Sequence, residues 1–334
     1  MFQKNVSLKS LNTFGIEAMA EFFAEVNSVD TLSKIVSTHK DLFILSGGSN
    51  ILLTKNISRP VVFLNTKGIE IIERKSGTVR VRAQAGENWH DFVLWCLSND
   101  FGGLENLSLI PGNVGTSPMQ NIGAYGVEIK DCFDSLEAME ISTGKIKTFV
   151  AEDCLFGYRE SVFKNDLKGK FIILNVTFKL STGKHQIHDN YGAIRDQLAI
   201  ENVITPTIQD ISNAVIAIRK TKLPDPKEIG NSGSFFKNPV ISIEHFLKLQ
   251  VANNDVPHYK ISDKLIKVPA GWLVEQCGFK GKRFGDAGVH KNQALVLVNY
   301  ATAKGSDILH LAEKIQSEVT KRFSINLEME VNII

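Results

Sequence analysis

Two glycine-rich segments contain the residue types that hold phosphate groups. The first is SGGSN at residues 46–50, and the second is IPGNVGTSPMQNIGAYG at 110–126. Glycine lets main-chain N–H groups approach a ligand closely and adopts φ > 0 without strain. Successive N–H groups that point inward form an anion site. Together the two segments favour a site that holds a pyrophosphate between them.

The glycine spacing does not match two common nucleotide sites. Neither segment reads GxGxxG before a helix, so a Rossmann dinucleotide site is not indicated, and no GxxxxGK[ST] of a P-loop NTPase occurs. Composition alone favours ordinary turns for such segments. The length of the second segment weighs against that interpretation, because long irregular loops inside compact domains are often functional.

Short apolar strands and amphipathic helices are expected to position these loops. The first loop lies between apolar runs at 42–45 and 51–53. Hydrophobic periodicity predicts helices over 28–40, 91–97 and 207–219, and strands over 69–85, 133–149 and 170–180.

The C-terminal part has its own helix and strand pattern. Two prolines at 222–226 predict a linker. A helix over about 307–323 carries a buried stripe, and a final strand over 325–333 alternates apolar and polar residues. A second α+β region is therefore expected after the linker.

Composition excludes several classes of function. The chain has 334 residues with a formal net charge of +2, which gives no electrostatic case for binding nucleic acid. Four separated cysteines and eight histidines show no metal-binding spacing, so no metal site is predicted. The N-terminus lacks a signal-peptide pattern, and no apolar run is long enough to span a membrane. These features predict a cytoplasmic protein of two or three domains with no membrane partner.

A series of motifs follows the second glycine-rich segment in order along the chain. They are GYRES (157–161), TKLPDP (221–226), GNSGSFFKNP (230–239), AGWLVEQCG (270–278), HKNQALVLVN (290–299) and LEMEV (327–331). Together with SGGSN and PGNVGTSPMQNIGAYG, they resemble the UDP-N-acetylenolpyruvoylglucosamine reductases (the MurB family). Asn190-Tyr191-Gly192 matches the tyrosine loop of the family's type I branch. The resemblance covers essentially the whole chain.

The resemblance implies an α+β fold with a substrate-binding domain at the C-terminus. An FAD-binding domain of the PCMH or vanillyl-alcohol-oxidase type is expected over 17–183, and an α+β substrate-binding domain over 219–324. The FAD-binding part would consist of a subdomain of about 1–65 with 325–334 and a second subdomain of about 66–218.

The resemblance also implies a reaction in cell-wall synthesis. NADPH, the co-substrate, reduces non-covalently bound FAD, and a hydride then passes to the enolpyruvyl group of UDP-N-acetylglucosamine enolpyruvate. The product is the peptidoglycan precursor UDP-N-acetylmuramate. Such a reaction needs a cation for the substrate carboxylate and a proton donor. A monomer is expected.

Three catalytic residues follow from the resemblance. Arg159 would hold the carboxylate and the enolate charge, Ser234 would donate the proton, and Glu330 would stabilise or protonate the enolate. Taken alone, each has a plain alternative: a surface ion pair for Arg159, a turn for Ser234 and a solvated strand face for Glu330. Met329 replaces the proline that is common in the family's LEPEV motif.

The expected contacts form two sets. The FAD contacts are Gly47, Gly48, Ser49, Asn50, Ile51, Pro111, Gly112, Gly115, Ser117, Gln120, Asn121, Ile122, Gly123 and Gly126. The substrate contacts are Tyr125, Tyr158, Tyr191, Arg219, Lys222, Asn238, Tyr259, Lys267 and Gln293.

Two other functions stay open beside the reductase. One is an oxidase of the same flavoprotein superfamily that uses oxygen, and the other is a non-catalytic UDP-sugar sensor. Oxygen uptake without NADPH consumption would indicate the oxidase, and a colourless protein that binds a UDP-sugar would indicate the sensor.

Overall fold

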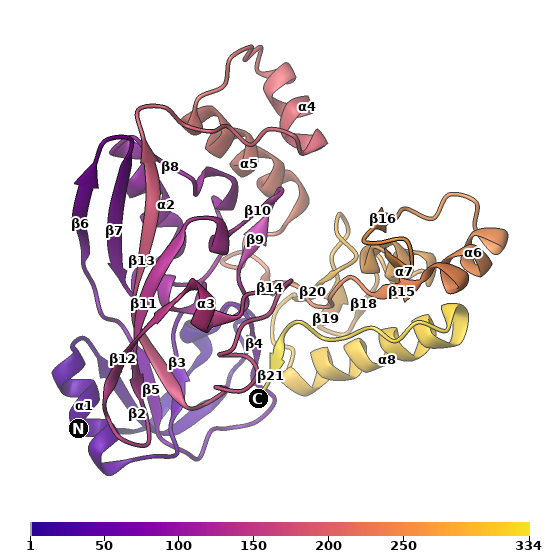
Figure 1. The fold of residues 1–334 in the computed structure, drawn as a ribbon. Coiled ribbons are helices and arrows are strands. Elements are labelled where there is room, and N and C mark those ends of the chain that lie inside the picture. Colours follow the sequence, from indigo (N-terminus) through magenta and orange to yellow (C-terminus); the bar gives the residue numbers. More distant parts are fainter. Residues whose placement is uncertain (1) are drawn as a thin grey trace. The chain divides into compact units, whose positions relative to one another are not determined.

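The structure is a computed structural model that describes residues 2–334. The chain forms two compact units. Unit 1 contains the residues up to 6, 20–47 and 58–221, and unit 2 contains 7–19, 48–57 and 222–334 (Figure 1). The predicted domain limits are not tested by this division and stay a prediction.

The first sheet of unit 1 is built around parallel strands. Its order is β1-β2-β5-β3, with bounds Gln3–Ser7, Met19–Val26, Val61–Leu64 and Phe43–Leu45. β5 pairs in parallel with both β2 and β3, so crossover connections are needed, and α1 (Val29–Thr38) lies in the one from β2 to β3. The helix begins where Ser28 Oγ accepts a hydrogen bond from the Thr31 N–H at 3.2 Å. Its buried face, which includes Leu32, packs on Val62 of the sheet.

The second sheet of unit 1 is antiparallel. Its order is β12-β11-β13-β7-β6, with β8 also on β13, and the bounds are Ile146–Val150, Phe133–Glu140, Phe171–Thr182, Thr78–Gln84, Ile69–Lys75 and Phe101–Gly102. β13 is central and nearly continuously buried. α2 (Trp89–Ser98) packs on it, because the Trp89 and Phe92 rings lie 5.8 and 5.2 Å from the Phe178 ring.

The remaining elements of unit 1 include those of the long glycine-rich loop. They are η2 (Glu105–Leu107), η3 (Val114–Thr116), β9 (Gly123–Ala124), β10 (Val127–Glu128), η4 (Ile129–Asp131), α3 (Ala151–Cys154), α4 (Gly192–Ile200) and α5 (Ile208–Lys222). α4 and α5 follow β13 (Figure 1) and bury a small core of their own, to which Tyr125 is added at the edge.

Unit 2 combines short sheets with three helices. One sheet has the order β14-β20-β19-β18 (Gly230–Ser234, Val296–Asn299, Ala287–Val289, Arg283–Phe284), and a second has the order β15-β17-β16 (Val240–Ser242, Leu265–Lys267, Tyr259–Lys260). β4 (Ile51–Leu52) pairs in parallel with β21 (Asn332–Ile333). The helices are α6 (Ile243–Ala252), α7 (Ala270–Gln276) and α8 (Gly305–Phe323), and a short turn of helix, η1, covers Lys9–Leu11.

Most predicted helices and strands are confirmed, but the last strand is not. α8 buries the predicted stripe of Ile308, Leu311, Ala312, Ile315 and Val319. The segment predicted as one strand over 325–333 forms only the two residues of β21 and an isolated bridge between Met329 and Phe236. Alternation predicts an extended chain, but a strand also needs a continuous partner, which this segment lacks.

Two features are absent from residues 2–334. None of the helices there combines the length and the apolar surface that a bilayer-spanning helix needs. Within the same range, no group of three or more His, Cys, Asp or Glu side chains has a metal-binding arrangement.

Candidate active site

The two glycine-rich loops touch main chain to main chain within unit 1. A Cβ placed on Gly47 would lie 2.7 Å from Gly112 Cα, and one placed on Gly115 would lie 2.5 Å from Ala85 Cβ. Such contacts leave no space for a side chain, so glycine is required on steric grounds at both positions. This contact lies where the sequence predicts the pyrophosphate of FAD to bind, and the FAD contacts stay a prediction.

Asn121 links the long loop to the segment that carries Arg159. Its side chain is fully buried, and its Nδ2 donates to the Gly157 carbonyl at 3.0 Å and to Glu128 at 3.0 Å. Ser161 Oγ donates to the Met119 carbonyl at 2.7 Å on the other side of the turn. The loop predicted to hold FAD therefore also fixes the turn predicted to carry the catalytic arginine.

Arg159 lies in a tight turn with an unusual main chain. The N–H of Gly157 donates to the Glu160 carbonyl at 3.0 Å and the return bond is 3.2 Å. Arg159 has φ of 57°, a left-handed value that is uncommon for a residue with a Cβ. Lys164 Nζ donates to the Arg159 carbonyl at 3.2 Å. Strained main chain of this kind concentrates at functional sites.

Tyr125 is presented by a two-residue hairpin turn. β9 and β10 pair through Ala124 and Val127, and both turn residues have positive φ, 50° at Tyr125 and 84° at Gly126. These are the dihedrals of a type I′ turn, in which Gly126 is well suited to the second position. The Tyr125 ring lies edge-on to the half-exposed Tyr191 ring at 5.3 Å. The hairpin thus brings together two of the predicted substrate contacts.

Arg219 lies near the end of α5 and points back to the same region. Its Nε donates to the Leu109 carbonyl at 3.2 Å. Burial is the main cause that lowers the pKa of Arg219, and the nearby positive charge of Arg159 lowers it further. A hydrogen bond with Tyr125 acts in the opposite direction and raises this pKa. Burial likewise raises the pKa of Tyr125. Two guanidinium groups that repel each other beside a tyrosine pair form a favourable site for an anion.

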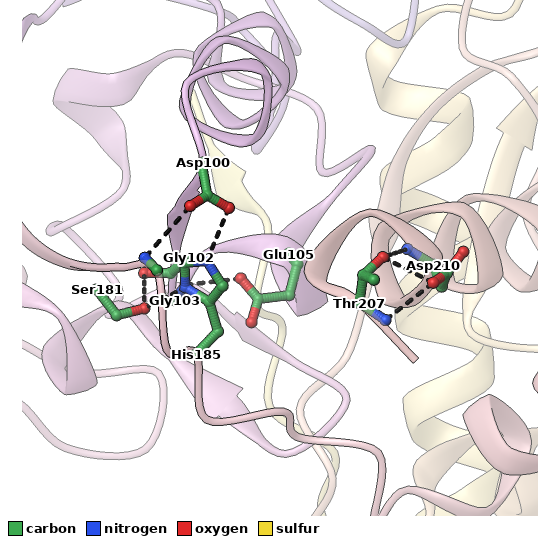
Figure 2. A network of polar contacts seen from close by, with 9 residues as sticks. Asp100, Gly102, Gly103, Glu105, Ser181, His185, Thr207 and Asp210 are labelled. Carbon is green, nitrogen blue, oxygen red and sulfur yellow. Dashed lines mark hydrogen bonds and ion pairs between the residues drawn. The ribbon is translucent and has the colours of Figure 1, made fainter. Parts of the chain in front are cut away.

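Two hydrogen-bond groups brace the chain that carries Tyr191 and Arg219 (Figure 2). His185 bridges Asp100 and Ser181, with Nε2 at 2.9 Å from Asp100 Oδ1 and Nδ1 at 2.8 Å from Ser181 Oγ. Thr207 and Asp210 form a reciprocal cap at the start of α5, with bonds of 2.8 and 3.2 Å. The segment between β13 and α5 is therefore anchored near both of its ends.

Ser234 is exposed by a bulge in β14. The strand register shifts between Asn231 and Ser234, and Gly233 adopts φ of 68°. A glycine in this conformation is characteristic of a bulge that re-aims the next side chain. Phe235 and Phe236 after it are fully buried, whereas Ser234 is exposed.

Ser232, two residues earlier, is held by other groups. Its Oγ lies 3.2 Å from Thr13 Oγ1 and 3.4 Å from the Ile51 carbonyl. Ser232 thus makes structural contacts within unit 2, and the role of Ser234 as proton donor stays a prediction.

Glu330 lies beside the strand that carries Ser234. Its N–H donates to the Phe235 carbonyl at 2.8 Å, and Asn50 Nδ2 donates to the Glu330 carbonyl at 3.3 Å. Glu328, the neighbouring acid, forms an ion pair with Lys237 at 2.5 Å.

Other predicted substrate contacts of unit 2 form pairs. Tyr259 is directly opposite Lys267 across β16 and β17. Asn238 Oδ1 accepts from the N–H of Ala270 at 2.9 Å, at the start of α7. The Gln293 side chain lies beside the next residue, Gly271, because a Cβ built there would be 3.3 Å from Gln293 Oε1. Lys222 is the exposed last residue of α5.

The other predicted FAD contacts lie on the two loops and adjoining elements. Gly123 belongs to β9, Ile51 to β4, and Ser117 Oγ donates to the Val114 carbonyl at 2.7 Å. Ile122 is buried, and its N–H donates to the Ser117 carbonyl at 3.1 Å. Gly48 packs against Leu11, and the loop set is completed by Ser49, Asn50, Pro111, Gln120 and Gly126.

Two residues of unit 1 were not among the predicted site residues. Asn106 is buried and its Nδ2 donates to the carbonyls of Tyr125 and His188, at 3.1 and 2.8 Å. His90 Nδ1 accepts from the N–H of Leu109 at 2.9 Å. Neither lies in a motif that signals a role, because both act on main-chain groups far away in the sequence.

The predicted site residues are brought together within each unit. Unit 1 gathers Arg159, Arg219, Tyr125 and Tyr191, and unit 2 gathers Ser234 and Glu330. That the two groups act on one substrate is a prediction.

The fold and these loops define a two-part flavoprotein. Residues 20–149 match the family model of an FAD binding domain, and residues 225–334 match that of the UDP-N-acetylenolpyruvoylglucosamine reductase C-terminal domain. The predicted α+β fold class and the FAD cofactor are thereby confirmed.

Full-length comparisons give the family. The chain is 56% identical over 334 residues to the UDP-N-acetylenolpyruvoylglucosamine reductase of Flavobacterium johnsoniae, with 99% of each chain covered. It is 48% identical to that of Pseudomonas syringae pv. syringae, with 99% of this chain and 98% of the relative covered. The chain belongs to the UDP-N-acetylenolpyruvoylglucosamine reductase family, as the motifs predicted.

A solved structure shares the fold. The UDP-N-acetylenolpyruvylglucosamine reductase (MurB) of Thermus caldophilus matches with a TM-score of 0.68 and 23% identity, covering 100% of this chain and 99% of that one.

Proposed function

We propose that this protein is an FAD-dependent reductase that uses NADPH to convert UDP-N-acetylglucosamine enolpyruvate to UDP-N-acetylmuramate for peptidoglycan synthesis. The observation that carries the proposal is the 56% identity, over the full length, to a protein named for this reaction. The catalytic motifs GYRES and GNSGSFFKNP support it.

The flavin would supply the redox chemistry. When bound, FAD would supply the hydride chemistry that links NADPH to the enolpyruvyl group. The close contacts of Gly47 with Gly112 and of Gly115 with Ala85 fit a main-chain cradle for its pyrophosphate.

The protein side chains would stabilise charge and move a proton. Hydride addition at one carbon leaves negative charge on its neighbour, conjugated with the carboxylate. The planar guanidinium of Arg159 would bind that carboxylate and the enolate charge. The exposed hydroxyl of Ser234 would donate the proton, and Glu330 would assist from the adjoining segment.

The substrate would be held by the tyrosine and basic side chains described above. Tyr191 would close over the diphosphate, and Tyr125, Tyr158, Arg219 and Lys222 would contact the nucleotide or sugar. Asn238, Tyr259, Lys267 and Gln293 would bind polar groups of the same ligand. The edge contact of Tyr125 with Tyr191 and the electropositive surroundings of Arg219 support this assignment.

An anaerobic stopped-flow experiment tests the function. NADPH should bleach the flavin absorbance of the purified protein, and UDP-N-acetylglucosamine enolpyruvate should restore it. Oxygen uptake without NADPH consumption, measured separately in aerated buffer, would indicate an oxidase instead. A colourless protein that binds a UDP-sugar would indicate a sensor.

The proposal extends to the setting of the enzyme. It would act as a monomer in the cytoplasm, without a nucleic-acid or membrane partner, in cell-wall biogenesis, cell shape and division. Cys96, Cys132, Cys154 and Cys277 are free thiols, which suits a reducing compartment. Light scattering of the holoenzyme would test the monomer.

A further inference from the structure

A single peptide segment joins His90, at the start of α2, to Arg219, near the end of α5. The N–H of Leu109 donates to His90 Nδ1 at 2.9 Å, and the carbonyl oxygen of Leu109 accepts from Arg219 Nε at 3.2 Å. The main chain of Leu109 therefore contacts both side chains.

Leu109 needs such support because its main chain is strained. Its φ is 58°, in the left-handed region that residues with a branched side chain rarely occupy. The two residues before it are attached on either side. Trp89 Nε1 donates to the Leu107 carbonyl at 2.9 Å, and Ser108 Oγ lies 2.8 Å from Ser212 Oγ of α5. The hydrogen bond from Leu109 to His90 completes this support at the residue that Arg219 contacts.

The bond requires a neutral imidazole. Nδ1 accepts from a main-chain N–H, so it must carry a lone pair, which protonation would remove. Burial is the largest cause that lowers the pKa of His90, and the charges of Arg219 and Lys220 on α5 lower it further, while Asp91 on its own helix opposes them. His90 is thus neutral at physiological pH and becomes charged in more acidic solution.

We propose that His90 is a positioning residue for substrate binding, whose neutral ring fixes the Leu109 main chain and thereby orients Arg219 toward the anionic substrate. This inference rests on the proposed function, in which Arg219 binds the enolpyruvyl nucleotide. His90 itself contacts a main-chain N–H and takes no part in the chemical step.

Two substitutions at His90 separate the hydrogen bond from the side chain's bulk. His90→Leu removes the acceptor. His90→Asn places an amide oxygen near the position of Nδ1, and that oxygen does not titrate. In the holoenzyme, His90→Leu should raise the KM for UDP-N-acetylglucosamine enolpyruvate about five- to tenfold, the effect of losing one hydrogen bond. The rate of flavin reduction by NADPH should stay unchanged, and His90→Asn should restore the wild-type KM.

The pH profile is a readout that a purely structural role would not alter. The ratio of the wild-type KM to the His90→Asn KM, measured at each pH so that substrate ionisation cancels, should be near one at pH 8. Burial lowers the pKa of His90 from its ordinary value of 6.5, so the ratio should rise only in solution more acidic than that value, where the wild type alone loses its acceptor. A ratio that stays flat to pH 5 would overturn the inference.

Arg219→Met distinguishes failure of this inference from failure of the proposed function. If Arg219→Met leaves the substrate KM unchanged, Arg219 is not a substrate contact and that part of the proposed function fails. If Arg219→Met raises KM while His90→Leu does not, the positioning role alone fails. If His90→Leu loses flavin, the pH series with His90→Asn decides between the same two outcomes. His39→Leu, at the end of α1, is the matched control and should leave KM unchanged.

Discussion

The N–H of Glu330 donates to the carbonyl oxygen of Phe235 at 2.8 Å. Phe235 follows Ser234 directly, so this bond sets the register between the C-terminal segment and the strand that carries the proposed proton donor. It does so although the two residues are far apart in the sequence. Lys237 and Glu328 add a main-chain bond of 2.9 Å and an ion pair to the same contact. The two segments that carry the acid and the hydroxyl are thus joined by main-chain hydrogen bonds.

Glu330→Gln should slow turnover with the enolpyruvyl substrate by about 10²-fold or more, because the carboxylate that supports protonation is lost. Flavin reduction by NADPH should continue at the wild-type rate. Glu328→Gln is the matched control, since it makes the same change two residues earlier, at a side chain that is exposed and pairs with Lys237. Steady-state kinetics of both variants would check this, and equal effects of the two would contradict the assignment of Glu330.

Ser234→Ala should retain flavin reduction by NADPH and slow reoxidation by the substrate about 10²- to 10⁴-fold. The side chain is exposed at the bulge, so its loss leaves no buried polar group unpaired. Ser232→Ala is the control, because that hydroxyl contacts Thr13 and should affect stability rather than reoxidation. Single-turnover stopped-flow traces separate the two half-reactions, and wild-type reoxidation in Ser234→Ala would remove Ser234 from the mechanism.

Tyr191→Phe should weaken substrate binding about fivefold to tenfold and leave FAD binding unchanged. The ring and its edge contact with Tyr125 are retained, so the effect isolates the hydroxyl, for which one hydrogen bond is the expected loss. Calorimetric titration of the oxidised holoenzyme with the enolpyruvyl substrate would measure it. Unchanged affinity would count against closure of this tyrosine over the diphosphate.

Gly47→Ala should reduce the flavin content of the purified protein. The new Cβ would lie 2.7 Å from Gly112 Cα, which is main chain and can only move if the two loops separate. Gly192→Ala is the control, because it has open space around it and lies in the first turn of α4, where alanine is favourable. The ratio of flavin absorbance to protein absorbance would report the result, and full flavin in Gly47→Ala would contradict the proposed cradle.

The sequence predicted local features well because local pattern determines them. The buried apolar residues of α8 recur every three or four positions, and this spacing predicts the helix whatever elements pack against it. Arg219 and its acceptor Leu109 are 110 residues apart, and no periodicity in either segment indicates that they meet. The prediction of a strand over the whole of 325–333 was wrong. Alternation of apolar and polar residues indicates an extended chain with two different faces, but it does not show that a neighbouring strand is present. The motifs indicated Arg159, Ser234 and Glu330 only through the family resemblance, because an isolated Arg, Ser or Glu is usually a surface residue.

Stability of the helix that carries Arg219 should depend on pH through Asp210. Hydrogen bonds from the hydroxyl and N–H of Thr207 lower the pKa of Asp210 from its ordinary value of 3.8. A carboxyl whose folded pKa is depressed contributes stability above its unfolded pKa, and that contribution is lost as the pH falls through the folded value.

Asp210→Ala should therefore lower the free energy of unfolding by about 0.5–1 kcal/mol at pH 7, as expected for a lost capping interaction. The difference from wild type should shrink as the pH is taken below 3.8. Urea denaturation at pH 7, 5, 4 and 3 would measure it, with Asp196→Ala on α4 as the exposed control; a difference that stays constant down to pH 3 would show that the charge of Asp210 is not what stabilises α5.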